Sequence, residues 1–206
     1  SYRVNCGGLA YTNASRIIFE ADGTYNIGGS AFSTVSPIAG TTDDPLYQTE
    51  RYGDSFSYNF PLADGVYEVT LMFAEINFNA ANSRVFNVAI EGTQVITNLD
   101  IWAKVGMNAA YNVTNRVAVS DGQLNIAFSN VEDNCKISAI QVQRIAGLDP
   151  QIQRPVLQGG QLRFDWVGSR LQTATNVLGP WSDVSGAVSP YLTPATNPAQ
   201  FFRVKQ

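Results

Sequence analysis

Apolar residues alternate with other residues over several stretches of the chain, and this pattern restricts the fold more than any other feature of the sequence. A period of two places every second side chain on one face, as in a strand that is buried on one side only. The clearest stretches span residues 56–60, 67–73, 86–90, 124–128 and 140–142. Turn sequences separate them, at Asp64-Gly65, Glu91-Gly92 and Asp121-Gly122. We therefore expect an all-β chain, folded as a jelly-roll-like antiparallel β-sandwich, with helical turns at most near residues 43–52 and 101–110.

The alternation stops in the segment 145–155, where one glycine and two prolines stand among polar residues, as is typical of a linker. Beyond it the sequence is again β-like, for example in GGQLRFDWVG and AQFFRV. We predict a main domain over residues 1–146, a linker over 147–155 and a small β appendage over 156–206. Trp166 and Trp181 are expected in the core of that appendage, because a domain of about 50 residues needs large side chains to be stable.

Charge and hydropathy exclude two kinds of partner. The chain has 13 Lys and Arg against 17 Asp and Glu, a net charge of −4, and its basic residues form no cluster, so we expect no nucleic-acid partner. No apolar run approaches the roughly 20 residues that cross a bilayer, so we expect no membrane partner. Only 15% of the residues are charged, while Tyr, Asn and Thr are frequent. This composition favours a secreted or cell-surface protein, and a start directly on a strand-like segment is what a mature chain would show.

The chain contains no histidine, which excludes Ser-His-Asp triads, Cys-His dyads and histidine-based metal centres. A pair of carboxylates could still hydrolyse a glycoside, and the candidates are Glu50, Glu75 and Asp133. However, Glu50 precedes Arg51, so a structural ion pair that holds this loop explains it more simply. Glu75 ends a strand, where a carboxylate commonly fixes a loop. We therefore expect no enzyme.

A structural calcium site built from Asp43, Asp44 or Asp133 oxygens is conceivable, but the spacing is not specific, and we assign no cofactor and no metal. Cys6 and Cys135 lie near the two ends of the main β region. Terminal strands of an antiparallel sandwich often lie together, so the sequence is compatible either with a disulfide or with two buried thiols.

Several aromatic residues stand on loop-like segments: Tyr25 beside a Gly-Gly pair, Tyr47 and Tyr52 in DDPLYQTERYG, and Phe78 at the end of a strand. A sugar ring has C–H patches on its faces and hydroxyls around its edge, so a lectin site pairs aromatic faces with Asp, Asn and backbone groups. The residue types fit that need. For any one tyrosine, half-buried packing is the simpler interpretation.

The chain also resembles a known family. The segments RVNCGG, GTTDDPLYQTERYG, FAEINF, RVFNVAIEG, NLDI and EDNCKISAIQV look like malectin and the malectin-like modules of carbohydrate-binding family 57. The likeness is collinear over about residues 2–143. It implies a jelly-roll-like sandwich whose loops bind short glucose oligosaccharides through aromatic residues and an aspartate.

Carried over position by position, the resemblance assigns carbohydrate binding to Tyr25, Tyr52, Asn77, Phe78 and Asp133. Asn77 is a departure, because the family commonly has FAEIYF where this chain has FAEINF, and a carboxamide offers less stacking area than a ring. Cys135 is a second departure, standing where the family often has proline.

The implied function is non-catalytic binding of a glucose-containing oligosaccharide or polysaccharide, which would direct a larger secreted glycoside hydrolase or surface protein to its glycan. A covalently linked catalytic domain is the expected partner. The alternative is a protein–protein adhesion or assembly module on the same scaffold. The tail, with LQTATNVLGPWSDV and a closing QFFRV, is similar to C-terminal β modules of secreted bacterial proteins, so we expect a bacterial source.

Overall fold

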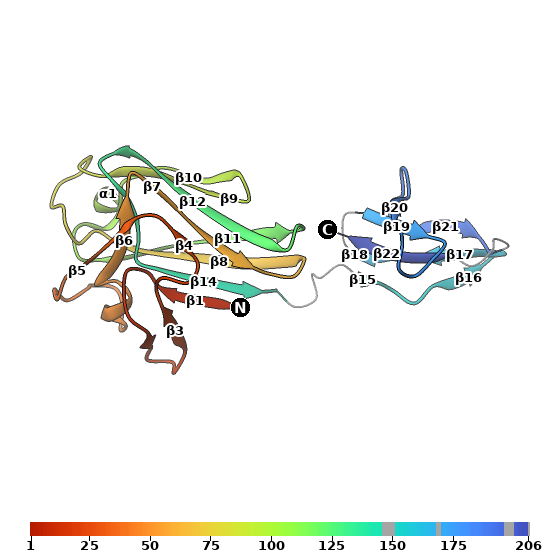
Figure 1. The fold of residues 1–206 in the computed structure, drawn as a ribbon, viewed down its shortest axis with the longest axis horizontal. Coiled ribbons are helices and arrows are strands. Elements are labelled where there is room, and N and C mark those ends of the chain that lie inside the picture. Colours follow the sequence, from red (N-terminus) through yellow and green to blue (C-terminus); the bar gives the residue numbers. More distant parts are fainter. Residues whose placement is uncertain (146–150, 168–169, 196–199, 206) are drawn as a thin grey trace. The chain divides into compact units, whose positions relative to one another are not determined.

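The computed structural model describes residues 1–145, 151–167, 170–195 and 200–205, and strands account for most of its regular structure (Figure 1). By internal contacts the chain divides into two compact units. The main unit comprises Ser1–Leu62, Tyr67–Val117 and Gln123–Arg144, and the C-terminal unit comprises Ala63–Val66, Ala118–Gly122 and Ile145–Gln206. The expectation of an all-β sandwich is confirmed. Among the described residues, no helix is both long and apolar enough to cross a membrane.

Two large sheets form the body of the main unit. The six-stranded sheet has the order β11 (Ala110–Val119), β8 (Gly65–Ala74), β14 (Ala139–Arg144), β1 (Tyr2–Asn5), β3 (Ile18–Ala21) and β2 (Tyr11–Thr12). The five-stranded sheet has the order β10 (Thr93–Leu99), β9 (Val85–Ile90), β12 (Gln123–Glu132), β7 (Ser55–Pro61) and β4 (Asn26–Ile27). In the six-stranded sheet β8, β14 and β1 are successively antiparallel, β1 and β3 are parallel, and β3 and β2 are antiparallel. All neighbouring strands of the five-stranded sheet run antiparallel.

The predicted alternation forms the core between these sheets. Strands β7, β8, β9, β12 and β14 cover the five stretches, and their alternate side chains are buried. Phe73 of β8 and Phe86 of β9 bring their ring centroids to 5.8 Å, so the inner faces of the two sheets meet. Figure 1 shows the same arrangement, with β8 and β14 in one layer and β7, β9 and β12 in the other.

A third, small sheet lies beside the sandwich and consists of β13 (Cys135–Ile137), β6 (Thr49–Gly53) and β5 (Ser30–Ser33). Tyr52 pairs with Ser30 on one side and with Lys136 on the other, and Glu50 pairs with Phe32. Because neighbouring residues of a strand face opposite sides, Phe32, Glu50, Tyr52 and Lys136 share one face of this sheet.

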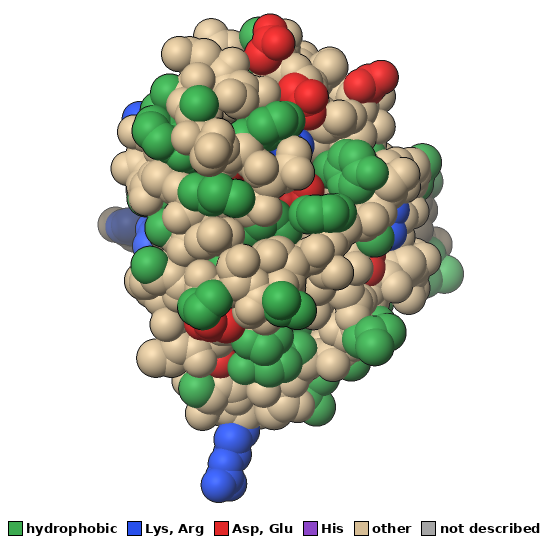
Figure 2. Space-filling model, turned by 90° about the vertical axis from the view of Figure 1, so that its left-hand side faces the viewer, with side chains coloured by type: hydrophobic (Ala, Val, Ile, Leu, Met, Phe, Trp, Pro, Cys, Tyr) green, Lys and Arg blue, Asp and Glu red, His purple; other side chains and the backbone are tan. Residues whose placement is uncertain are grey.

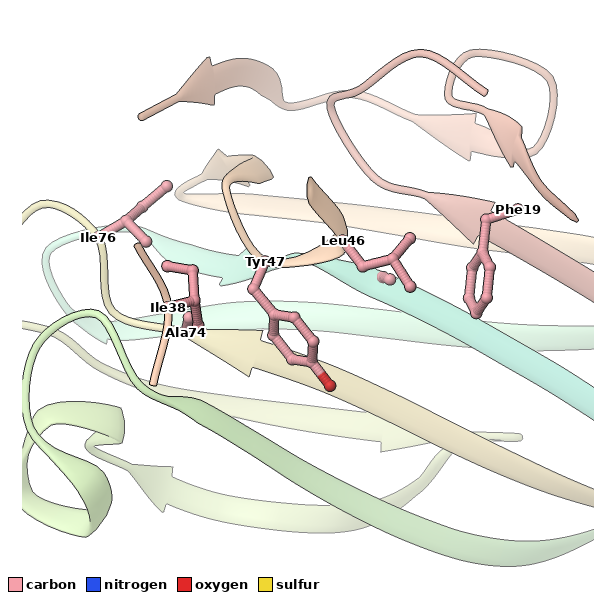
Figure 3. Close-up of a cluster of buried hydrophobic side chains, with 7 residues drawn as sticks. Phe19, Ile38, Leu46, Tyr47, Ala74 and Ile76 are labelled. Carbon is pink, nitrogen blue, oxygen red and sulfur yellow. The ribbon is translucent and has the colours of Figure 1, made fainter. Parts of the chain in front are cut away.

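Two short helices in the described part of the chain fall where helical turns were expected. The 3-10 helix η1 spans Asp44–Leu46 and α1 spans Ile101–Val105, with Asp100 Oδ1 accepting a hydrogen bond from the Ala103 N–H at its N-cap. Beside η1, Tyr47 is buried in a hydrophobic cluster (Figure 3). Its hydroxyl donates to Asn112 Oδ1 at 3.0 Å. Tyr47 is therefore a core residue rather than a loop aromatic.

The described residues from Gln151 onward form three small sheets of the C-terminal unit. Their strands are β15 (Gln151–Ile152) with β18 (Trp166–Val167), then β16 (Val156–Gln158), β17 (Gln161–Phe164) and β21 (Tyr191–Pro194), then β20 (Ser182–Asp183), β19 (Arg170–Ala174) and β22 (Phe201–Lys205). Residues 147–150 of the predicted linker lie outside the described residues, and β15 begins inside the segment predicted as linker.

The two tryptophans of this unit differ in position. Trp166 is buried with Phe164 and Leu171, as expected of a core residue. Trp181 is only half buried, and the Arg203 guanidinium lies 4.6 Å from its ring centroid. The expectation of a core position is thus wrong for Trp181, whose ring face is covered by a charged side chain instead.

The two cysteines are separate buried thiols, so the disulfide that the sequence left open is not formed. Cys6 lies in the turn after β1, and Cys135 lies in the small sheet. The Cys6 N–H donates to the Ser138 carbonyl, whereas Cys135 lies in β13 and its thiol donates to the Gly53 carbonyl at 2.9 Å. Burial raises the pKa of Cys6 well above its ordinary value and that of Cys135 to about 12.

Candidate functional site

A pocket of about 300 Å³ lies over the face of the small sheet that carries Tyr52. It is lined by Phe32, Glu50, Tyr52, Asn77, Phe78, Arg84, Asp133 and Asn134. Four of the five residues that the family resemblance assigned are therefore brought together. They come from three separate segments of the chain: the small sheet, the loop after β8, and the turn between β12 and β13.

Glu75 shapes the loop that carries Asn77 and Phe78. Its side chain is buried, and Oε1 accepts hydrogen bonds from the Asn77 N–H at 3.0 Å and from the Phe78 N–H at 3.1 Å. A carboxylate that accepts two backbone N–H groups holds a loop in one conformation. Glu75 thus has the loop-fixing role that we predicted from its position at the end of a strand.

Arg84 connects this loop with the turn that carries Asp133. Its Nε lies 2.9 Å from Glu75 Oε2, and its Nη1 donates to the Asn134 carbonyl at 2.9 Å. Its guanidinium carbon lies 5.0 Å from the ring centroid of Phe78. The ion pair is almost completely buried, so the two loops share one internal support.

Asp133 projects from the turn between β12 and β13. Its backbone is left-handed, with φ of 52°, which Asp and Asn adopt more readily than most residues. Oδ1 accepts from the Asn134 N–H at 2.6 Å and from Asn134 Nδ2 at 3.1 Å. The side chain is exposed, and Oδ2 accepts no hydrogen bond from the described residues, so one carboxylate oxygen faces solvent.

A buried ion pair lies on the same face of the small sheet as Tyr52. Lys136 Nζ contacts Glu50 Oε2 and also donates to the Ala74 carbonyl, and both side chains are buried. The predicted ion pair between Glu50 and Arg51 is wrong, because neighbouring residues of β6 face opposite sides of the sheet. Arg51 pairs instead with Asp22, Nε to Oδ2, at 2.6 Å.

Arg51 and Asp22 border a second hollow of about 410 Å³, on the other face of the same sheet. Arg51 Nη1 also donates to the carbonyls of Gly28 and Gly29, and the Tyr58 hydroxyl and the Gly7 N–H donate to Asp22. Both charged groups are therefore engaged within the protein. This network holds the chain before β5 against β6.

Tyr25 does not line the pocket. Its ring centroid lies 4.9 Å from that of Tyr2 and 5.0 Å from that of Phe60, and its hydroxyl donates to Glu20 at 3.4 Å. The ring is thus a packing residue. An aromatic residue of the same glycine-rich region, Phe32, lines the pocket instead and is 42% exposed.

Sequence reasoning missed Phe32, Arg84 and Asn134. Phe32 lies in a short strand whose residues are all exposed, so β5 shows no alternation. Its pairing with the QTERY strand is the signal that places it beside Tyr52. Arg84 begins the motif RVFNVAIEG, and Asn134 follows Asp133 in EDNCKISAIQV, so both stood inside recognised segments without an assigned role.

The aspartates considered for calcium are hydrogen-bond acceptors. Asp43 Oδ1 accepts from the Tyr11 hydroxyl and the Ala14 N–H, and Asp44 Oδ2 accepts from the Ile38 N–H. Asp133 lies in the pocket and does not join them. Over the described ranges, no group of three or more Asp, Glu, Cys or His is placed to hold a metal ion.

A β-sandwich that presents three aromatic rings, two carboxylates and two carboxamides around one pocket has the features of a lectin-like binding domain. The chain belongs to the malectin family, because the family described as "Malectin domain" matches residues 1–148. A malectin domain is a non-catalytic module, which confirms the expectation that the main domain is not an enzyme.

Similar proteins support the assignment. The chain is 31% identical to Malectin-B of Xenopus laevis over 173 residues, which is 74% of this chain and 63% of that protein. A β-glucuronidase of Bacteroides uniformis is 25% identical with a TM-score of 0.64, over 70% of this chain and 18% of that chain. The extracellular domain of ANXUR2 from Arabidopsis thaliana shares the fold, with a TM-score of 0.66 and 16% identity over 72% of this chain and 49% of that one.

Proposed function

We propose that the main unit binds a glucose-containing oligosaccharide or polysaccharide in the pocket over the small sheet, without transforming it. The observation that carries this proposal is the convergence of Tyr52, Phe78, Asp133 and Asn77 from three segments of the chain. Aromatic faces suit the C–H patches of a pyranose ring, and carboxylate and carboxamide groups suit its hydroxyls. The family resemblance implies the same ligand class.

The rigidity of the pocket supports binding rather than catalysis. Glu50 and Glu75, the carboxylates considered for a catalytic pair, are buried in ion pairs with Lys136 and Arg84. These pairs fix the elements around the pocket before a ligand arrives, so little ordering is needed on binding. We expect millimolar to micromolar affinity, with Asn77 adding hydrogen bonds in place of the stacking area of a ring.

We further propose that this domain directs a larger secreted or surface protein, such as a glycoside hydrolase of bacterial origin, to its glycan. The similar segment of the Bacteroides uniformis β-glucuronidase supports this, because there the fold accompanies a named glycosidase. Linking a binding module to a catalytic domain raises the local concentration of the enzyme on its substrate.

Titration calorimetry with α- and β-linked glucose disaccharides, preceded by a glycan array, tests the proposal. Tyr52→Ala and Phe32→Ala should each weaken binding about tenfold, since each removes one stacking ring. Phe201→Ala is the matched control, because Phe201 is 38% exposed and lies in the C-terminal unit. The proposal fails if no glycan binds, or if neither pocket variant differs from the control.

Protein–protein contact is the alternative that the sequence left open. Figure 2 views the end of the main unit at the left of Figure 1, and there hydrophobic side chains form separate patches among polar and acidic ones. A stable protein interface usually has a contiguous apolar centre. This surface favours a polar ligand, and a glycan array without any binder would favour the alternative.

A further inference from the structure

The charged side chains around the pocket differ in whether they have an ionic partner. Glu50 is paired with Lys136, and Arg84 is paired with Glu75. All four side chains are at most 4% exposed. Each pair is formally neutral, so the charges of these two pairs largely cancel at the pocket.

Asp133 is different. No Lys or Arg of the described part of the chain lies within ion-pair distance of it, and its hydrogen bonds come from Asn134 alone. Its side chain is exposed at the pocket. The pocket therefore carries one unpaired negative charge, held in place by a turn with a left-handed residue.

The positive charge of Arg84 is committed to contacts within the protein. Its Nε and Nη1 are bonded to Glu75 and to the Asn134 carbonyl, and its face covers the ring of Phe78. Because its side chain is only 4% exposed and its charge is paired with that of Glu75, Arg84 presents little positive charge to a ligand.

We infer that the pocket selects sugars by charge: it accepts neutral sugars, prefers an amino sugar whose ammonium group approaches Asp133, and disfavours uronic acids and sulfated sugars. This inference rests on the proposed function and adds the ligand class. Charge complementarity of this kind contributes specificity more than affinity, chiefly by repelling the wrong partner. Because the Asp133 carboxylate is exposed, we expect Kd to rise about two- to fivefold from an amino sugar to a neutral sugar, and by a similar factor from a neutral sugar to a uronic acid.

The experiment compares the methyl glycosides of glucosamine, glucose and glucuronic acid, in both anomers, by chemical-shift titration of the full chain. At about pH 6 the carboxylate of the glucuronide is ionised and the amine of the glucosaminide is protonated. We expect the affinity order glucosamine, glucose, glucuronic acid. The spread should shrink in high salt, which screens an exposed charge.

Asp133→Asn should remove the order, and Asn is suitable because it tolerates a positive φ. Glu20→Gln is the matched control, since it changes the net charge equally at a carboxylate that does not line the pocket. We expect Glu20→Gln to keep the order of the wild type.

Three results would overturn the inference. Equal binding of the three glycosides would do so while leaving the proposed function intact. Preferential binding of the glucuronide would show that the pocket attracts an anion, against the role inferred for Asp133. Failure of all three glycosides and of the glucose disaccharides to bind would overturn both the inference and the proposed function.

Discussion

The guanidinium carbon of Arg84 lies 5.0 Å from the ring centroid of Phe78, and the same group forms the buried ion pair with Glu75. One side chain thus orients an aromatic ring of the pocket and fixes the loop that carries it. Glu75 in turn holds the backbone of Asn77 and Phe78. Arg84 is therefore a positioning residue for the proposed ligand.

Arg84→Lys should weaken glycan binding several-fold. The accompanying loss in the free energy of unfolding should be smaller than the loss in binding free energy. Lysine keeps the charge toward Glu75 but cannot span Glu75 and the Asn134 carbonyl as a planar fork does. Calorimetric titration and thermal unfolding measure the two effects. Arg51→Lys is the control, because it alters the Arg51–Asp22 ion pair on the other face of β6. Equal losses of affinity in both variants would argue against a specific role of Arg84.

Lys136→Met should destabilise the main unit by about 3–5 kcal/mol, because it leaves Glu50 buried without its partner. The double variant Lys136→Met with Glu50→Gln should recover part of that loss, since residue 50 then carries no unpaired buried charge. Urea unfolding followed by far-UV circular dichroism measures both. A double variant no more stable than Lys136→Met alone would contradict the assignment of the ion pair.

Asn77→Tyr should tighten binding of a glucose oligosaccharide by about two- to tenfold, because an added aromatic contact contributes about 0.5–1.5 kcal/mol. The side chain at this position is exposed, so the substitution disturbs no packing. Asn77→Ala is the reference for loss of the carboxamide. Weaker binding of the tyrosine variant in calorimetry would mean that the carboxamide makes the better contact.

Both thiols should be unreactive in the folded protein and should titrate fully after unfolding. Burial raises the pKa of Cys135 to about 12 and that of Cys6 well above its ordinary value, so at about pH 8 almost no thiolate is present. Reaction with Ellman's reagent, without reductant, should give no colour before denaturation and two equivalents after it. Fewer equivalents in the unfolded chain would reveal a disulfide.

The strands of the sandwich were predictable because their burial is one-sided and therefore leaves a period of two in the sequence. The motifs likewise located Tyr52, Phe78 and Asp133. Phe32 was not predictable, since all residues of β5 are exposed and only its pairing with β6 brings it to the pocket. The same holds for the partner of Glu50, which depends on the register that places Lys136 opposite Tyr52.

The loop after β8 is held through its backbone. Asn77 contributes its N–H to Glu75, while its side chain is exposed at the pocket. Any residue other than proline supplies that N–H. The identity of residue 77 can therefore change while the loop keeps its shape, so the lining of the pocket can be altered at this position without rebuilding the loop.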